Sequence, residues 1–135
     1  MADLEVALET RLLAYATLTA LVSDRIWPMI LHIDETVKHV IYPAVTYQRT
    51  DGPRESALGA EMGLAHPGIQ IDSWGKTYAS AKAVATQARA ALQRWSSEAT
   101  DPVVLDCLLE SDGDEYEPGA NIYHVRQEWT VWHRE

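Results

Sequence analysis

The sequence predicts an α+β domain in which a largely antiparallel sheet is covered by two helices. Apolar and polar residues alternate through most of 121–135, which is the period of a strand half-buried on a core. Two other segments, 4–21 and 78–92, place apolar residues three and four positions apart, as amphipathic helices do. Strands that are joined by short loops and lie beside two helices favour an antiparallel sheet.

The first helix is predicted to run from Leu4 to about Leu21, because Asp3 can act as its N-cap. One side of this helix carries an apolar stripe formed by Leu4, Leu8, Leu12 and Tyr15. Pro28 then marks a change in chain direction, with Trp27 beside it in the exit loop. We expect residues 29–42 to form a further loop.

Two strands are predicted in the middle of the chain. Residues 43–49 are rich in β-branched and aromatic types, and residues 68–74 place Ile69 and Ile71 on the inward face. We expect residues 50–66 to form a long connection, because four of them favour turns: Gly52, Pro53, Gly59 and Gly63.

The second helix is predicted over 78–92, with Thr77 as its N-cap. Its apolar stripe is mostly alanine, so the helix can lie close to the sheet that it covers. The stripe comprises Tyr78, Ala81, Ala85, Ala88, Leu92 and Trp95.

A third strand is predicted at 102–110, followed by a turn-rich acidic loop at 111–120 and the final strand. In the final strand Val125 and Trp129 face the core, whereas His124 faces away from it. The apolar face of the 102–110 strand comprises Val103, Leu105, Cys107 and Leu109.

Length and composition indicate a single domain spanning residues 1–135. The chain has a mass of 15.1 kDa, and 47% of its residues are hydrophobic, which is sufficient for a core. Cys107 is the only cysteine, so no internal disulfide can form. Acidic residues follow Met1 where a signal peptide carries bases, and no apolar run reaches membrane-spanning length. We therefore expect synthesis in the cytosol.

Negative charge is concentrated in one part of the chain. The 20 acidic residues outnumber 11 lysines and arginines, which gives a net charge of −9. Most of the excess lies in a block without bases, comprising Glu98, Asp101, Asp106, Glu110, Asp112, Asp114, Glu115 and Glu117. Binding to DNA phosphates requires clustered Lys and Arg, so we expect that this chain does not bind DNA through its phosphates. The acidic block itself is interpreted as a solvated hairpin.

The motifs of common enzymes are missing. The segment 75–77 (GKT) lacks the glycine that a phosphate-binding loop requires five residues earlier, where Gln70 stands. The five histidines form no H-x-x-x-H pair and are interpreted as scattered surface or edge residues. Cys107 lies on the apolar face of its strand, so we expect a buried thiol and not a nucleophile.

The acidic loop offers one candidate ion site. Asp112, Asp114 and Glu117 could hold Ca²⁺ through their carboxylates, but the segment lacks the twelve-residue pattern of a calcium loop. A tight hairpin turn is the simpler interpretation. We therefore predict no catalytic residue, no metal site and no cofactor.

Three tryptophans lie outside the predicted core stripes. Trp74 and Trp132 fall on the faces of their strands opposite the apolar sets, and Trp27 lies in the exit loop. A tryptophan in such a position often marks a surface for a partner protein. A second layer of the same domain, such as a helix, could equally cover these rings, and both interpretations stay open.

Several segments, taken in order, resemble the tail completion proteins of long-tailed phages, which are also called tail terminator or head–tail joining proteins. The resemblance covers nearly the whole chain and departs from the family at residues 29–40, where the family usually has a shorter loop rich in Pro and Gly. The similar segments are 21–28 (LVSDRIWP, the helix exit), 43–49 (the first long strand), 69–74 with 78–92 (the central strand–helix unit), and 114–116 with 129–135 (the ending).

The resemblance implies an α+β fold related to tail tube subunits and a ring, commonly a hexamer, that caps the finished tail tube. The implied partners are other copies of the chain, the tail tube protein and the head–tail connector or stopper protein, with DNA only as passing cargo and no membrane. The implied location is the neck of the virion, after assembly in the host cytoplasm. A negative wall in such a ring would let DNA slide through it.

Candidate contact residues are Trp27, Arg54, Glu55, Trp74 and Trp132. Arg54 and Glu55 are chosen because the 50–66 connection could reach a neighbour, although a solvated loop tip explains them equally. Two other classes remain as alternatives. One is a small α+β enzyme or a metal- or ligand-binding domain that uses the acidic loop and His124, and the other is a different neck or tail tube subunit.

Overall fold

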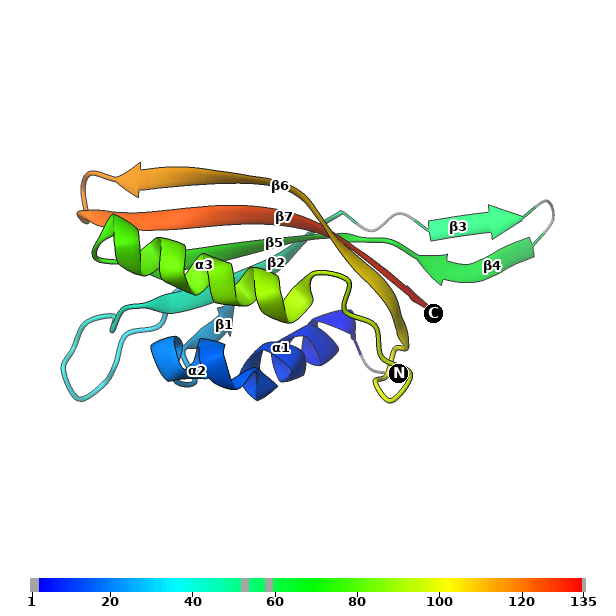
Figure 1. The fold of residues 1–135 in the computed structure, drawn as a ribbon, viewed down its shortest axis with the longest axis horizontal. Coiled ribbons are helices and arrows are strands. Elements are labelled where there is room, and N and C mark those ends of the chain that lie inside the picture. Colours follow the sequence, from blue (N-terminus) through cyan, green and yellow to red (C-terminus); the bar gives the residue numbers. More distant parts are fainter. Residues whose placement is uncertain (1–2, 52–53, 58–59, 135) are drawn as a thin grey trace.

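The computed structural model describes residues 3–51, 54–57 and 60–134, with side chains described outside 51–62. It confirms the predicted α+β fold with a largely antiparallel sheet, and Figure 1 shows the helices together on one face of that sheet. No helix among these residues is long and apolar enough to cross a membrane. The helices are α1 (Leu4–Ala14), α2 (Ala16–Val22) and α3 (Tyr78–Leu92). The strands are β1 (Ile26–Pro28), β2 (Ala44–Asp51), β3 (Arg54–Ala57), β4 (Ala60–Ala65), β5 (Gly68–Gly75), β6 (Val104–Glu117) and β7 (Ile122–Arg134).

The described strands form one sheet in the order β1-β2-β5-β7-β4-β3, with β6 pairing along β7. β1 and β2 run parallel, and the other described pairs are antiparallel. β5 and β4 follow each other along one side of β7, where they pair with residues 123–130 and 133–134 respectively. The β2–β5 and β3–β4 pairs are therefore two halves of one long hairpin. Figure 1 shows the far half, the β3–β4 hairpin, extending beyond the helices.

The prediction of a long connection at 50–66 is wrong, because most of its described residues are strand. Gly63 has a φ of +73° and lies in a register shift, where Glu55 pairs with Leu64 but Ser56 pairs with Glu61. Glycine adopts this backbone without steric cost, which suits an irregular hairpin as well as a loop. The other turn-forming residues of the segment, Gly52, Pro53 and Gly59, lie outside the described residues.

The single first helix predicted for 4–21 is instead two helices. Tyr15 has extended backbone angles (φ −87°, ψ 100°) and separates α1 from α2. Its ring packs against the core, and the guanidinium carbon of Arg11 lies 5.6 Å from the ring centroid. The apolar spacing continues across the break through the buried Leu18 and Val22, so periodicity alone does not reveal it.

The core lies between the three helices and the sheet face beneath them. Trp129 of β7 is its largest fully buried side chain. The prediction of α3 is confirmed: Thr77 is its N-cap and accepts a hydrogen bond from the Ser80 backbone N–H at 3.1 Å. The alanines of the stripe are buried, whereas Tyr78 is 47% exposed and does not belong to the core.

The junction between β5 and α3 explains the segment 75–77. A Cβ atom on Gly75 would lie 2.7 Å from the backbone nitrogen of Ala81, so a larger residue would push the helix away from the strand. Gly75 therefore ends a strand and Thr77 caps a helix, in agreement with the interpretation that rejected a phosphate-binding loop.

The strand predicted at 102–110 continues much further along the chain. β6 pairs with β7 up to Glu117, so residues 111–117 of the predicted acidic loop are extended strand, and the turn of the predicted hairpin follows at 118–121. A register shift between Val104 and Asp106 also changes the inward face, because Val104 is buried whereas Leu105 is 37% exposed. Pairing with β7 extends β6 although acidic residues and glycine are poor strand formers.

Cys107 is confirmed as a buried thiol. Its side chain is fully inaccessible, and burial together with the nearby charge of Asp106 raises its pKa to about 12. Because the thiolate is the reactive form, we expect Cys107 in the folded protein to react with a soluble thiol reagent at pH 8 at least about a hundredfold more slowly than in urea. A colorimetric labelling time course measures both rates. Equal rates in the two conditions would contradict the buried position.

Candidate interaction surface

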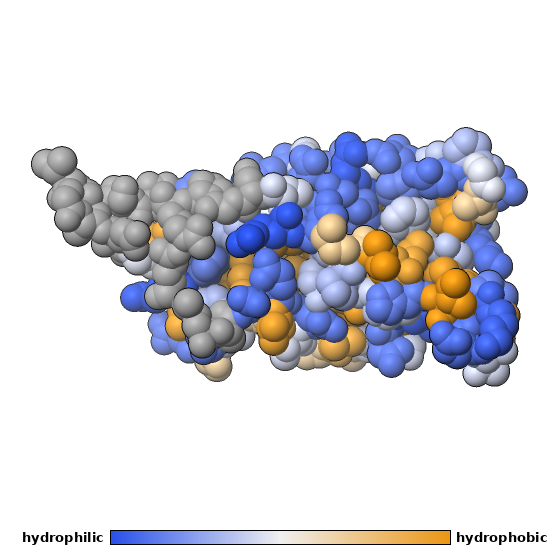
Figure 2. Space-filling view, turned by 180° about the vertical axis from the view of Figure 1, so that it is seen from behind, coloured by the Kyte–Doolittle hydropathy of each residue, from blue (hydrophilic) through white to orange (hydrophobic). Residues whose placement is uncertain are grey.

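The sheet face that points away from the helices carries most of the candidate residues. The Gln127 side-chain amide donates to the Ala85 carbonyl of α3 at 3.1 Å, so alternate β7 residues from His124 to Trp132 point the opposite way. Figure 2 views the molecule from this side. We call it the open face. It comprises Trp27, Thr46, Gln70, Asp72, Trp74, Glu115, Glu117, His124, Arg126, Glu128, Thr130 and Trp132.

All three tryptophans singled out from the sequence lie on the open face. Trp27, which lies in β1 and not in an exit loop, pairs with Thr46, and the Trp74 indole N–H donates to the Thr46 hydroxyl at 3.0 Å. Each indole is partly buried and stacks on a histidine ring: Trp27 on His32, Trp74 on His124 and Trp132 on His66, with centroids 5.0, 4.2 and 4.3 Å apart. In the described part of the chain, histidine rings rather than a helix provide this partial cover.

A buried histidine lies at one end of the open face. His124 is only 6% exposed, so its interpretation as a surface or edge residue is wrong. Its Nδ1 lies 3.3 Å from Oδ1 of Asp72, and its Nε2 lies 3.1 Å from Glu115 and 3.2 Å from Glu117. Alternation along β7 correctly places the His124 side chain on the sheet face that points away from the helices. Its ring is nevertheless buried, because Trp74 and the carboxylates of two neighbouring strands enclose it.

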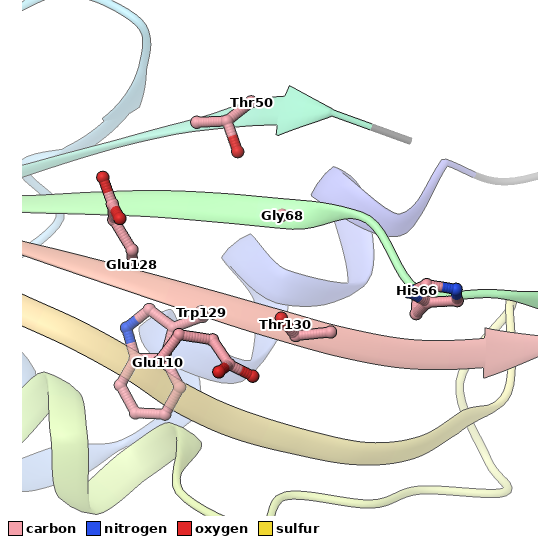
Figure 3. Close-up of a pocket in the computed structure, with 7 residues that line it drawn as sticks. All are labelled: Thr50, His66, Gly68, Glu110, Glu128, Trp129 and Thr130. Carbon is pink, nitrogen blue, oxygen red and sulfur yellow. The ribbon is translucent and has the colours of Figure 1, made fainter. Parts of the chain in front are cut away.

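A hollow of about 410 Å³ lies on the sheet at the base of the β3–β4 hairpin (Figure 3). Glu110 of β6 and Glu128 of β7 bring two carboxylates to it, and Glu128 also accepts a hydrogen bond from the Ser111 hydroxyl at 3.0 Å. Its lining is completed by Thr50, His66, Gly68, Trp129 and Thr130. An acidic hollow of this kind suits a basic or polar side chain of a partner protein.

The loop at 29–42 is confirmed as a loop and exposes four large apolar side chains. Met29, Ile30, Ile33 and Val37 are between 46% and 66% exposed, and we call them the loop patch. The loop joins the C-terminal end of β1 to the N-terminal end of β2, and because these strands are parallel it must cross back along the sheet. Figure 1 shows this loop reaching the end of the molecule opposite the β3–β4 hairpin. Exposed apolar clusters mark protein contacts. The apolar residues within a predicted loop were the signal available in the sequence.

The acidic block lies mostly along β6, which pairs only with β7 among the described strands and so forms an edge. Several of its charges have partners. Lys82 lies 3.7 Å from Asp114, and Arg94 lies 3.1 Å from Asp106. The hydroxyl of Tyr78 donates to Asp114 at 2.5 Å, and this hydrogen bond raises the pKa of the phenol.

Arg54 and Glu55 begin β3 on the projecting hairpin. Their backbone places them on an arm that extends past the helices, instead of in a loop tip (Figure 1). The structure thus distributes the five candidates over the open face and the hairpin. It adds the loop patch and the acidic edge, which sequence reasoning did not assign to contacts.

The described residues form an α+β domain whose sheet has one face without helices, with a projecting hairpin and an exposed apolar loop. The chain matches the family described as tail completion protein gp17 over residues 6–134, and it belongs to that family. Membership gives it a structural role in a phage tail.

A solved structure supports the fold. One chain of "Virion of native gene transfer agent (GTA) particle" superimposes with a TM-score of 0.81 at 16% sequence identity, over 98% of this chain and 95% of that chain. At this identity the likeness concerns the fold alone. No curated protein matches the chain.

Proposed function

We propose that the protein is a tail terminator subunit. Copies of the chain assemble into a closed ring, expected to be a hexamer, at the head-proximal end of the tail tube. The ring joins the tube protein on one side to the connector or stopper protein of the head on the other. The chain performs this role without catalysis and within a single domain. The observation that carries the proposal is the projecting β3–β4 hairpin.

Among the described residues, the hairpin is paired with the rest of its subunit only at its base. In the described residues β3 pairs with β4 alone, and β4 reaches β7 only through Leu64 and Ala65. A two-stranded hairpin is marginally stable by itself in water. A neighbouring subunit that receives the hairpin would supply the missing contacts.

A ring also requires two different complementary surfaces on each subunit, because its contacts run head to tail. The β3–β4 hairpin and the 29–42 loop, which carries the loop patch, lie at opposite ends of the molecule, as such a contact demands (Figure 1). We assign the hairpin of one subunit to the patch end of the next. Arg54 and Glu55 then belong to this subunit contact.

The remaining surfaces are assigned to the axial partners and to the channel. Trp27, Trp74 and Trp132 on the open face are partly buried and available to the tube or connector protein. The acidic edge of β6 is the candidate channel wall, since negative charge would let DNA pass without binding.

Electron microscopy of particles made without this protein tests the proposal. We expect DNA-filled heads beside separate tails, some of them longer than normal, because nothing stops the tube or joins it to the head. Normally joined virions would contradict the proposal. Purified protein that polymerises into long cylinders, instead of single rings, would point to a tube subunit.

Trp132→Ala is expected to weaken tail joining more than folding. The indole lies on the open face, so its loss removes a contact group but leaves the core intact. Counting joined particles by microscopy and measuring the melting temperature of the purified variant separates the two effects. Val6→Ala, which removes an exposed side chain of α1, serves as the control. A variant that melts far lower but joins normally would show that Trp132 stabilises the fold instead.

A further inference from the structure

We propose that Glu115, Glu117 and His124 form a binding site for one divalent transition-metal ion, with Zn²⁺ as the best match. The site lies on the open face, near the turn that connects β6 to β7. The proposal is independent of ring assembly.

Strand pairing brings the three donors together. Glu115 lies directly opposite His124 in the β6–β7 pair, and Glu117 follows two residues later on the same face. His124 Nε2 is 3.1 Å from Glu115 Oε2 and 3.2 Å from Glu117 Oε1. The three ligand atoms all lie within 4.8 Å of one another. Donors bound tetrahedrally to Zn²⁺ at about 2.0–2.1 Å stand about 3.3 Å apart, so two of the three spacings already match coordination.

The histidine is held as a metal ligand usually is. Its Nδ1 faces the buried carboxylate of Asp72 at 3.3 Å, and its ring stacks on Trp74 at 4.2 Å. The Gln70 side-chain amide donates to the other oxygen of Asp72 at 2.9 Å and orients that carboxylate. A carboxylate on the second ring nitrogen fixes the tautomer whose lone pair, here on Nε2, points at the ion.

The charge around the site also favours a cation. Three carboxylates, those of Asp72, Glu115 and Glu117, contact one imidazole. Arg126 pairs with Oε1 of Glu115 and leaves Oε2 of the same carboxylate facing His124. A divalent ion would offset the remaining negative charge.

The donor set selects the class of metal. One imidazole nitrogen and two carboxylate oxygens suit Zn²⁺ and similar first-row ions, whereas Mg²⁺ and Ca²⁺ prefer oxygen alone. The side chains of Glu115 and Glu117 are 40% and 51% exposed, so water can complete the coordination.

Calorimetric titration of ZnCl₂ into chelator-treated full-length protein tests the site. We expect binding of one ion per chain and a higher melting temperature with Zn²⁺, because an ion that binds only the folded state stabilises it. MgCl₂ at the same concentration is expected to produce neither effect. Absence of saturable Zn²⁺ binding would overturn the proposal.

Two matched variants locate the ion. Glu117→Gln removes an exposed ligand and is expected to weaken Zn²⁺ binding roughly tenfold or more. Glu35→Gln removes an exposed carboxylate of the 29–42 loop, outside the three-residue cluster, and should bind as the unmodified protein does. If Glu117→Gln and the unmodified protein bind Zn²⁺ with equal affinity, the ion binds at other residues and the proposal is overturned. Circular dichroism spectra of both variants verify that they fold.

Discussion

Replacing residues 54–61 with an Asn-Gly turn is expected to abolish ring formation and head–tail joining while the rest of the molecule still folds. The replacement removes β3 and the start of β4 but keeps Leu64 and Ala65, through which β4 pairs with β7. Because the β3–β4 hairpin is the arm assigned to the neighbouring subunit, its loss should remove the head-to-tail contact from every subunit of the ring at once.

Three measurements evaluate the shortened protein. Its melting temperature should stay within a few degrees of the unmodified protein, its circular dichroism spectrum should retain the helical signal, and complemented particles should show separate heads and tails. The double substitution Arg54→Ala with Glu55→Ala keeps the length of the hairpin and removes only these two side chains. We expect a partial loss of head–tail joining, because the backbone of the hairpin remains. Normal particles from the shortened protein would exclude the hairpin from assembly.

Trp129→Ala is expected to lower the free energy of unfolding by about 3–5 kcal/mol, the usual cost of deleting a large buried aromatic side chain. Trp129 is 1% exposed and pairs across the sheet with Ile69 on one side and Leu109 on the other. The substitution would leave a cavity in the core between the helices and the sheet. Urea denaturation monitored by circular dichroism measures the change.

Trp132 provides the matched comparison, because it lies three residues further along β7 on the opposite face. Trp132→Ala should change stability much less than Trp129→Ala and assembly much more. Trp129→Phe should cost less than Trp129→Ala, since it retains a ring and removes an indole N–H that has no hydrogen-bond partner among the described residues. A loss below about 1 kcal/mol for Trp129→Ala would contradict the core assignment.

The elements with strong local signals were predicted correctly. The Thr77 cap, the alanine stripe of α3 and the strands at 43–49 and 68–74 all appear where the sequence indicates them. Cys107 is buried as predicted. In each case the period of the apolar residues or the capping residue depends only on neighbours within a few positions.

The errors share one physical cause. The break at Tyr15, the strand that includes Gly63 and the acidic half of β6 all depend on contacts with distant segments. A strand partner can extend residues that are poor strand formers, and composition then indicates a loop where tertiary pairing produces a sheet. The same limit applies to His124, because alternation assigned its face correctly but could not reveal the carboxylates that enclose it.

Local signals were enough to predict the fold class, the positions of α3 and the main strands, and the resemblance to tail completion proteins, because periodicity, capping and residue type act over a few positions. The folded structure was needed to reveal that three tryptophans share one open face, that β3 and β4 form a projecting hairpin, and that two glutamates meet a buried histidine. These arrangements follow from the register between strands far apart in the chain, and a one-residue change in that register would move every side chain to the other face.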